Sequence, residues 1–194
     1  LPSARPWLEL VVTLCTAGAL VWHMLQPGRT RPGVDALATL AGALYLGWMG
    51  RHFVALRLAS QGLWWTALAL LSTWITDSGA YFVGRRWGRR PLAPRLSPKK
   101  TWEGAVGGWL TGVALTPAVA WLLGLSPWHG LALGALIATA APFGDLAESM
   151  FKRQVGAKDS SNLIPGHGGM LDRIDSLLFV IPCAYYYLLL AGVI

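Results

Sequence analysis

Charged residues are scarce in this sequence. Only 13% of its 194 residues are Asp, Glu, Lys or Arg, whereas 54% are hydrophobic and the mean hydropathy is +0.47. Soluble domains carry about 25% charged residues, and a chain of this length cannot hide so much apolar surface from water in one core. The composition therefore excludes an ordinary soluble domain and indicates an integral membrane protein.

The sequence has only two cysteines and neither of the common nucleotide-binding motifs. The two cysteines, Cys15 and Cys183, both lie in apolar stretches, so neither a disulfide framework nor a zinc motif is available. The sequence contains no GxxxxGK[ST] motif and no GxGxxG after a strand. A nucleotide ligand would therefore bind without a P-loop.

What the sequence has instead is long apolar runs. Residues 104–144 contain no Asp, Glu, Lys or Arg, and this run is too long for one crossing, which needs about 20 residues. A turn signal at 126–130 divides it. Backbone groups in lipid must be satisfied within their own segment, so we predict an all-α membrane bundle of about six transmembrane helices. The expected spans are 7–26, 34–50, 62–83, 104–124, 130–150 and 176–194. We divide this one membrane domain into N-terminal helices (1–61) and a catalytic region (62–194).

The basic residues gather in two loops, 85–103 and 151–175. An uncharged hairpin joins these loops and returns the chain to the same side. Short basic loops face the cytoplasm, so we expect a multi-pass protein whose polar site lies at the cytoplasmic face of a bacterial inner membrane. The alternative is that these lysines and arginines only set the topology.

The acidic residues point to the same face. Seven of the nine lie near span ends beside the basic loops, and carboxylates near hydrocarbon are costly and commonly functional. These seven are Asp77, Glu103, Asp145, Glu148, Asp159, Asp172 and Asp175.

Two acid pairs have the spacing of one helix face. Asp145 and Glu148 lie on one face with Ser149, and Lys152 extends that stripe; Asp172 and Asp175 are also three residues apart. Two such pairs can hold hard cations, since magnesium favours one or two carboxylates together with phosphate oxygens. The alternative is ion pairing at helix ends, such as Asp172 with a nearby arginine.

Two loops carry groups suited to phosphate. Glycines around His167, in 163–173, allow backbone N–H groups to approach an anion closely before a helix start. In 96–104, Ser97-Pro98 is a turn signal, and Lys99 and Lys100 follow it. These lysines can neutralise phosphate, or they can merely anchor the chain to anionic lipid.

Two stretches resemble one enzyme family. SMFKRQVGAKDSSNLIPGHGGMLDRID (149–175) is similar, almost position for position, to the C-terminal signature of phosphatidate cytidylyltransferases. TDSGAYFVGRRWGRRPLAPRLSPKKTWEGAVGG (76–108) resembles the conserved stretch that precedes that signature. The resemblance covers roughly the last two-thirds of the chain. Family members commonly carry further helices upstream of this region.

The resemblance implies a reaction in which CTP and phosphatidate give CDP-diacylglycerol and pyrophosphate. It implies Mg²⁺, with a second, monovalent cation such as K⁺ left open. The expected partners are CTP, phosphatidate and membrane lipid, without nucleic acid; a homodimer is left open. The alternatives are a related membrane enzyme that uses CTP on another lipid, such as a polyprenol kinase or an ether-lipid cytidylyltransferase, and a transporter or structural protein.

From the residues and the resemblance together we assign the site residues by role. The catalytic set is Asp145, Asp172, Asp175, Lys152 and Arg153. The metal set is Asp145, Asp172, Ser149, Asp175 and Glu148. The substrate-binding set is Asp77, Ser97, Lys99, Lys100, Thr101, Lys158, Asp159, His167, Gly168 and Arg173.

Overall fold

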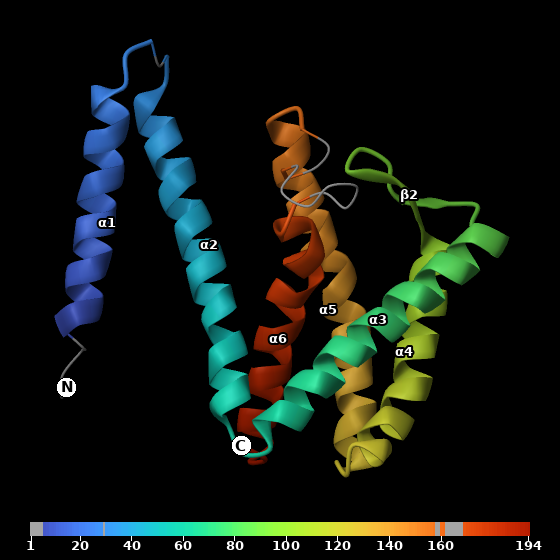
Figure 1. Cartoon of the computed structure of the whole chain (residues 1–194). Helices are drawn as coiled ribbons and strands as arrows, with labels where there is room; N and C mark the ends of the chain where they lie inside the picture. The colour runs from blue at the N-terminus through green and yellow to red at the C-terminus, as the bar shows by residue number, and fades with distance from the viewer. Residues whose placement is uncertain (1–5, 29, 158–159, 162–168) are drawn as a thin grey trace. The chain divides into compact units, whose positions relative to one another are not determined.

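Six helices and one short hairpin make up the part of the chain that the computed structural model describes, residues 6–28, 30–157, 160–161 and 169–194 (Figure 1). The predicted all-α class is confirmed. The helices are α1 (Pro6–Leu25), α2 (Pro32–Leu58), α3 (Gly62–Trp87), α4 (Trp102–Leu122), α5 (Pro127–Gln154) and α6 (Leu171–Leu190). Strands β1 (Pro91–Ala93) and β2 (Ser97–Thr101) lie between α3 and α4.

Four of these helices are long and apolar enough to cross a membrane. They are α1, α4, α5 and α6. Helices α2 and α3 are as long but contain several charged residues, among them Arg51 and Arg57 in α2 and Arg85 and Arg86 in α3. A multi-pass membrane protein is therefore supported, while the number of crossings, six, stays a prediction.

The chain divides into two compact units, Leu1–Gly50 and Arg51–Ile194. In the first unit, His23 Nε2 of α1 lies 3.0 Å from Thr39 Oγ1 of α2. The second unit holds every described residue that we assigned to the site. The remaining description concerns this second unit.

Helices α3 and α4 pack closely because glycine lines their crossing. A Cβ atom on Gly104 would lie 2.8 Å from the carbonyl oxygen of Ala80, and one on Gly108 would lie 2.7 Å from that of Thr76. Real Cβ atoms do not approach backbone oxygens so closely, so neither position accepts a side chain without a shift of the helices. Glycine thereby brings the polar end of α3 against the start of α4.

Helices α5 and α6 form the apolar core with α3 and the end of α2. Fully or almost fully buried side chains from all four helices contact one another. The largest are Leu56, Leu68, Leu133, Ile137, Ile181 and Leu188. This packing fixes the polar end of α5 relative to the first turn of α6.

The hairpin is the element that the sequence analysis missed. Strands β1 and β2 pair antiparallel, with Pro91 opposite Thr101 and Ala93 opposite Ser97. The turn lies at 94–96, where Leu96 N–H donates to the Ala93 carbonyl oxygen at 3.1 Å. Our placement of the turn at Ser97-Pro98 is therefore wrong, because both residues belong to β2.

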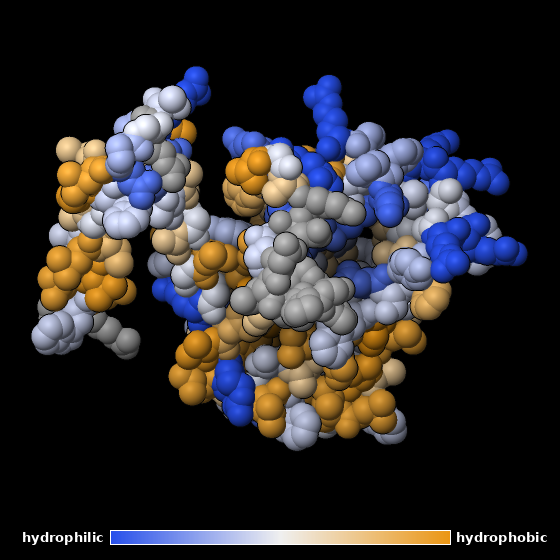
Figure 2. Space-filling model, turned by 45° about the horizontal axis from the view of Figure 1, so that its top comes forward, coloured by the Kyte–Doolittle hydropathy of each residue, from blue (hydrophilic) through white to orange (hydrophobic). Residues whose placement is uncertain are grey.

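The polar residues of the second unit gather at one end. The hairpin, the end of α5 and the first turn of α6 lie at the same end in Figure 1. Figure 2 shows most of the hydrophilic residues around that end, while hydrophobic residues cover much of the remaining visible surface. A polar face above an apolar body is the arrangement expected of a site at a membrane surface.

Candidate active site

Four elements bring the described site residues together. Asp77 comes from α3 and Ser97–Thr101 from β2. Helix α5 supplies the residues from Asp145 to Arg153, and α6 supplies Asp172, Arg173 and Asp175. Lys158, Asp159, His167 and Gly168 lie outside the described residues.

Lys100 and Asp145 form the central ion pair of the site. Lys100 Nζ on β2 contacts Asp145 Oδ2 on α5, and both side chains keep roughly a third of their surface exposed, 28% and 33%. The carboxylates of Asp77 and Asp175 interact electrostatically with both Lys100 and Asp145. Three carboxylates from three helices therefore lie within electrostatic range of one ammonium group, and Asp145 is the one that contacts it.

A second, more buried cluster joins α5 to α6. Lys152 Nζ donates to Glu148 Oε2 at 2.9 Å and to Asp172 Oδ1 at 2.7 Å. Glu148 is only 2% exposed, and its Oε1 has no hydrogen-bond partner among the described residues. As predicted, the stripe from Asp145 through Glu148 and Ser149 to Lys152 lies on one face of a helix: Ser149 Oγ points to Asp145 Oδ1 at 3.4 Å.

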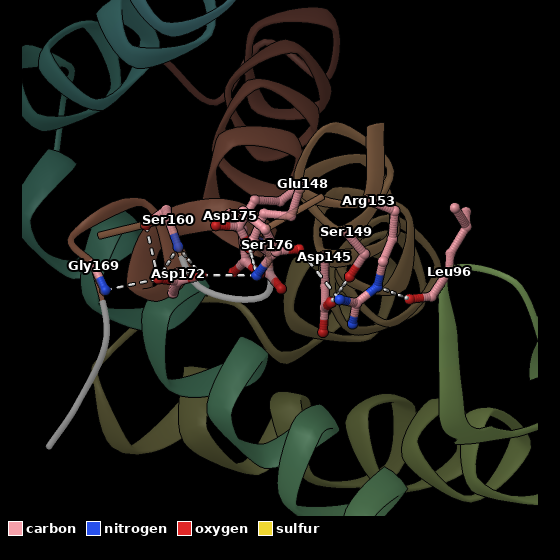
Figure 3. Close-up of polar contacts among 12 residues, drawn as sticks. Leu96, Asp145, Glu148, Ser149, Arg153, Ser160, Gly169, Asp172, Asp175 and Ser176 are labelled. Carbon is pink, nitrogen blue, oxygen red and sulfur yellow. Dashed lines mark hydrogen bonds and ion pairs between the residues drawn. The ribbon is translucent and has the colours of Figure 1, made fainter. Parts of the chain in front are cut away.

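Asp172 binds two described residues that precede α6 in the sequence. Its Oδ2 accepts hydrogen bonds from Ser160 Oγ at 2.7 Å, from Ser160 N–H at 3.0 Å and from Gly169 N–H at 2.7 Å (Figure 3). With Lys152 on Oδ1, both carboxylate oxygens are engaged. Asp172 thus binds Ser160, twelve positions earlier in the sequence, and Gly169, three positions earlier.

Arg153 connects α5 to the hairpin. Its Nε donates to the Leu96 carbonyl oxygen at 3.4 Å (Figure 3). Its Nη1 donates to the Ala157 carbonyl oxygen at 3.2 Å. The first of these is long for a hydrogen bond. The guanidinium group therefore contacts both the turn of the hairpin and the residues that follow α5.

A cavity of about 550 Å³ opens beside the Lys100–Asp145 pair. Residues of α3, the hairpin, α4 and α5 line it. Asp77, Ser97, Lys99, Lys100, Thr101 and Asp145, all assigned from the sequence, are among the lining residues. The cavity therefore combines carboxylates, ammonium groups and hydroxyls in a space that suits a small charged ligand.

Tyr81 and Arg85 are among the cavity residues that were not assigned from the sequence. Arg85 Nη1 donates to Tyr81 Oη at 2.9 Å. Their four-residue spacing on α3, on the same stripe as Asp77, is the signal that could have found them. Arg173, assigned to the substrate, is exposed on the first turn of α6.

The carboxylates beside the cavity suit a magnesium ion that shares its ligands with a substrate. No group of three or more His, Cys, Asp or Glu with metal-binding geometry occurs among the described residues. Magnesium needs fewer protein ligands, since it is commonly held by one or two carboxylates with substrate phosphates and water. Asp145, with Asp77 and Asp175 nearby, fits that chemistry, and the ammonium of Lys100 already occupies a cationic position there. Glu148 and Asp172 are instead engaged by Lys152, and their place in the metal set stays a prediction.

Comparisons with known proteins agree on one group of enzymes. Residues 1–191 match the group described as "Cytidylyltransferase family". Over 155 residues the chain is 44% identical to the phosphatidate cytidylyltransferase of Bacillus subtilis (strain 168), covering 78% of this chain and 57% of that protein. Over 133 residues it is 45% identical to that of Haemophilus influenzae (strain ATCC 51907 / DSM 11121 / KW20 / Rd), covering 66% and 46%.

A longer match is found with the phosphatidate cytidylyltransferase of Staphylococcus aureus (strain COL). It is 38% identical over 184 residues, covering 92% of this chain and 70% of that protein. The chain thus spans about half the length of the Bacillus and Haemophilus relatives, 57% and 46%.

Proposed function

This chain belongs to the cytidylyltransferase family, and from that membership we propose that it transfers the CMP moiety of CTP to phosphatidate, giving CDP-diacylglycerol and pyrophosphate. The observation that carries the proposal is the Lys100–Asp145 pair beside a cavity with further carboxylates and a second lysine. The names of the 38–45% identical relatives support the same reaction.

The reaction is a displacement at phosphorus. A phosphate oxygen of phosphatidate forms a bond to the α-phosphorus of CTP, and the bond between that phosphorus and the α,β-bridging oxygen breaks, so pyrophosphate leaves. The attacking phosphate is already ionised, and a strong general base is therefore not needed. Catalysis then depends on positioning two anions and stabilising their charge.

The residues around the cavity suit that task. We propose that Lys99 and Lys100 bind phosphate oxygens of the nucleotide or the lipid, with Ser97 and Thr101 as neutral hydrogen-bonding groups beside them. Asp145, with Asp77 and Asp175 near it, would hold Mg²⁺, which neutralises phosphate charge when bound. The family resemblance leaves open whether a second, monovalent cation such as K⁺ binds beside it.

The cluster around Lys152 suits a supporting task. Lys152 fixes Asp172 against α5, and Asp172 fixes Ser160 and Gly169. We propose that this cluster holds Ser160 and Gly169 in place; the predicted residues Lys158, Asp159, His167 and Gly168 lie outside the described residues. Arg153 contacts both the hairpin turn at Leu96 and Ala157 after α5.

We propose that the lipid enters sideways from the bilayer and that CTP arrives from the cytoplasm. The positive-inside rule supports this orientation for 85–103 and 151–175. The contact of Arg153 with both Leu96 and Ala157 supports placing the two segments on one side.

The test is an assay of the purified chain with CTP labelled at the α-phosphorus, Mg²⁺ and a panel of lipid phosphates. We expect label in CDP-diacylglycerol, and pyrophosphate in equal amount. A polyprenol kinase would instead release CDP and phosphorylate a lipid alcohol. Transfer to a lipid other than phosphatidate, or no transfer by a folded protein, would contradict the proposal.

A further inference from the structure

Glu103 joins two chain segments that meet at the base of the hairpin. It lies in the first turn of α4. Its Oε2 accepts hydrogen bonds from the backbone N–H groups of Arg89 at 3.0 Å and Arg90 at 3.2 Å. These two residues follow the end of α3 and lead into β1. One carboxylate oxygen therefore fixes both ends of the hairpin to each other.

Two further bonds hold the same base. Trp102 N–H donates to the Arg90 carbonyl oxygen at 2.9 Å. Thr101 Oγ1 accepts a hydrogen bond from Gly104 N–H at 3.1 Å and so caps the start of α4. The cap satisfies one of the N–H groups that a helix start leaves open. Glu103 adds two bonds that reach across to the other side of the hairpin.

The base controls where Lys100 lies. Lys100 directly precedes Thr101, which pairs with Pro91 at the open end of the hairpin, opposite the turn. Lys100 is therefore adjacent to Thr101 and only three positions before Glu103, the two residues whose side chains hold the base. A small movement of this base would carry Lys100 away from Asp145, since the two residues belong to different elements.

We propose that Glu103 is a positioning residue: through the backbone N–H groups of Arg89 and Arg90 it holds Lys100 at Asp145 and at the cavity. The inference rests on the proposed function for its catalytic consequence, but not for its structural one. The bonds need an acceptor oxygen at the right reach, not a negative charge. This requirement separates positioning from a direct electrostatic role, and it dictates the choice of variants.

Three variants distinguish the two roles. Glu103→Gln keeps the reach and one acceptor oxygen but removes the charge. Glu103→Asp keeps the charge but withdraws the oxygens by one methylene. Glu103→Ala removes both. If Glu103 positions the hairpin, Glu103→Gln retains more activity than Glu103→Asp. If its charge acts directly, Glu103→Asp retains more activity than Glu103→Gln.

The first measurement needs no substrate. Amine acetylation at Lys100 and Lys99 is followed by mass spectrometry in detergent, at fixed pH. In the wild type, Lys100 reacts more slowly than the exposed Lys99, because its ammonium is engaged by Asp145. Glu103→Gln keeps this difference, whereas Glu103→Asp and Glu103→Ala reduce it. Glu9→Gln, a matched change of an exposed acid on α1, leaves it unaltered.

The second measurement is CDP-diacylglycerol formation by the same proteins. Misplacement of a reacting group by about 1 Å can cost about 100-fold in rate. We therefore expect kcat to fall about 10- to 100-fold in Glu103→Asp and Glu103→Ala, beyond any change in KM for CTP. Unchanged Lys100 protection in both of these variants, or a greater loss of activity in Glu103→Gln than in Glu103→Asp, would overturn the inference. If Glu103→Ala does not fold, the comparison of Glu103→Gln with Glu103→Asp still decides. A wild type with the expected labelling pattern but no product would refute the proposed function and leave the positioning role standing.

Discussion

Lys152 Nζ lies 2.7 Å from Asp172 Oδ1, and this contact joins the last turns of α5 to the first turn of α6. The same ammonium group donates to Glu148, whose side chain is almost completely buried. One lysine therefore compensates two carboxylates that come from different helices.

Lys152→Met should destabilise the protein. It leaves the buried Glu148 carboxylate without its cation, and removal of one partner from a buried pair costs about 3 kcal/mol or more. The readout is the thermal unfolding midpoint in detergent. The double variant Glu148→Gln, Lys152→Met should recover much of the loss, because it removes the stranded charge as well. Lys99→Met, at an exposed lysine of β2, is the control; a midpoint as low as that of Lys152→Met would contradict the shared-cation interpretation.

Asp145→Asn should abolish turnover while leaving the fold intact. Asp145 is a third exposed and contacts Lys100 and, weakly, Ser149, so little packing depends on its charge. If it holds the cation that serves the phosphates, its loss should cost at least about 100-fold in rate. The measurement is CDP-diacylglycerol formation over a magnesium series, with thermal unfolding in parallel. A stable variant that keeps the wild-type rate would remove Asp145 from the metal set.

Asp172→Asn should behave differently, because Asp172 has structural bonds that Asp145 lacks. An amide has one acceptor oxygen, so it cannot serve Lys152, Ser160 and Gly169 as the carboxylate does. Hydrogen bonds to charged groups are worth about 1.5–3 kcal/mol. We therefore expect lower thermal stability together with lower activity. Stability equal to wild type, with activity lost, would assign Asp172 to the metal alone.

The helices could be predicted because apolar runs and helical spacing are local properties. The one-face stripe of Asp145, Glu148 and Lys152 follows from i, i+3 and i, i+4 geometry and is confirmed. Helix α2 runs on to Leu58, past the predicted span end at 50. A charged residue such as Arg51 ends an apolar run, but it does not end a helix.

What the sequence could not provide are contacts between elements. The hairpin was missed because its second strand, Ser97–Thr101, contains proline and two lysines, which are poor strand formers. The pairing of Lys100 with Asp145 depends on how β2 meets α5, which no local spacing encodes. The hydrogen bonds of Glu103 are invisible for the same reason, although a carboxylate in the first turn of a helix is itself an expected feature.

Lys100→Ala should lower activity more than Lys99→Ala, although the sequence presents the two residues alike. Lys100 is paired with Asp145 and half-buried, whereas Lys99 is exposed and its charge is more strongly screened. We expect about 10-fold or greater loss for Lys100→Ala and a smaller loss for Lys99→Ala. The measurement is kcat/KM for CTP at two salt concentrations. Equal losses that both vanish at high salt would indicate lipid anchoring by charge alone.

The hairpin turn and the end of α5 should be labelled from the cytoplasmic side, and the start of α5 from the opposite side. Arg95→Cys and Val155→Cys place single thiols at exposed positions near the contact between Arg153 and the Leu96 carbonyl oxygen. Trp128→Cys, at an exposed position in the first turn of α5, is the matched control for the other end of this candidate span.

All three variants are made with Cys15→Ala and Cys183→Ala, and a membrane-impermeant maleimide is applied to right-side-out and inverted vesicles. Because α5 is long enough to cross the bilayer, the thiols of Val155→Cys and Trp128→Cys should react in different vesicle preparations. If Arg95→Cys and Val155→Cys were labelled from different sides, the hairpin and the end of α5 would lie on opposite sides of the membrane. Lys100 could then not contact Asp145, and the shared site would be refuted.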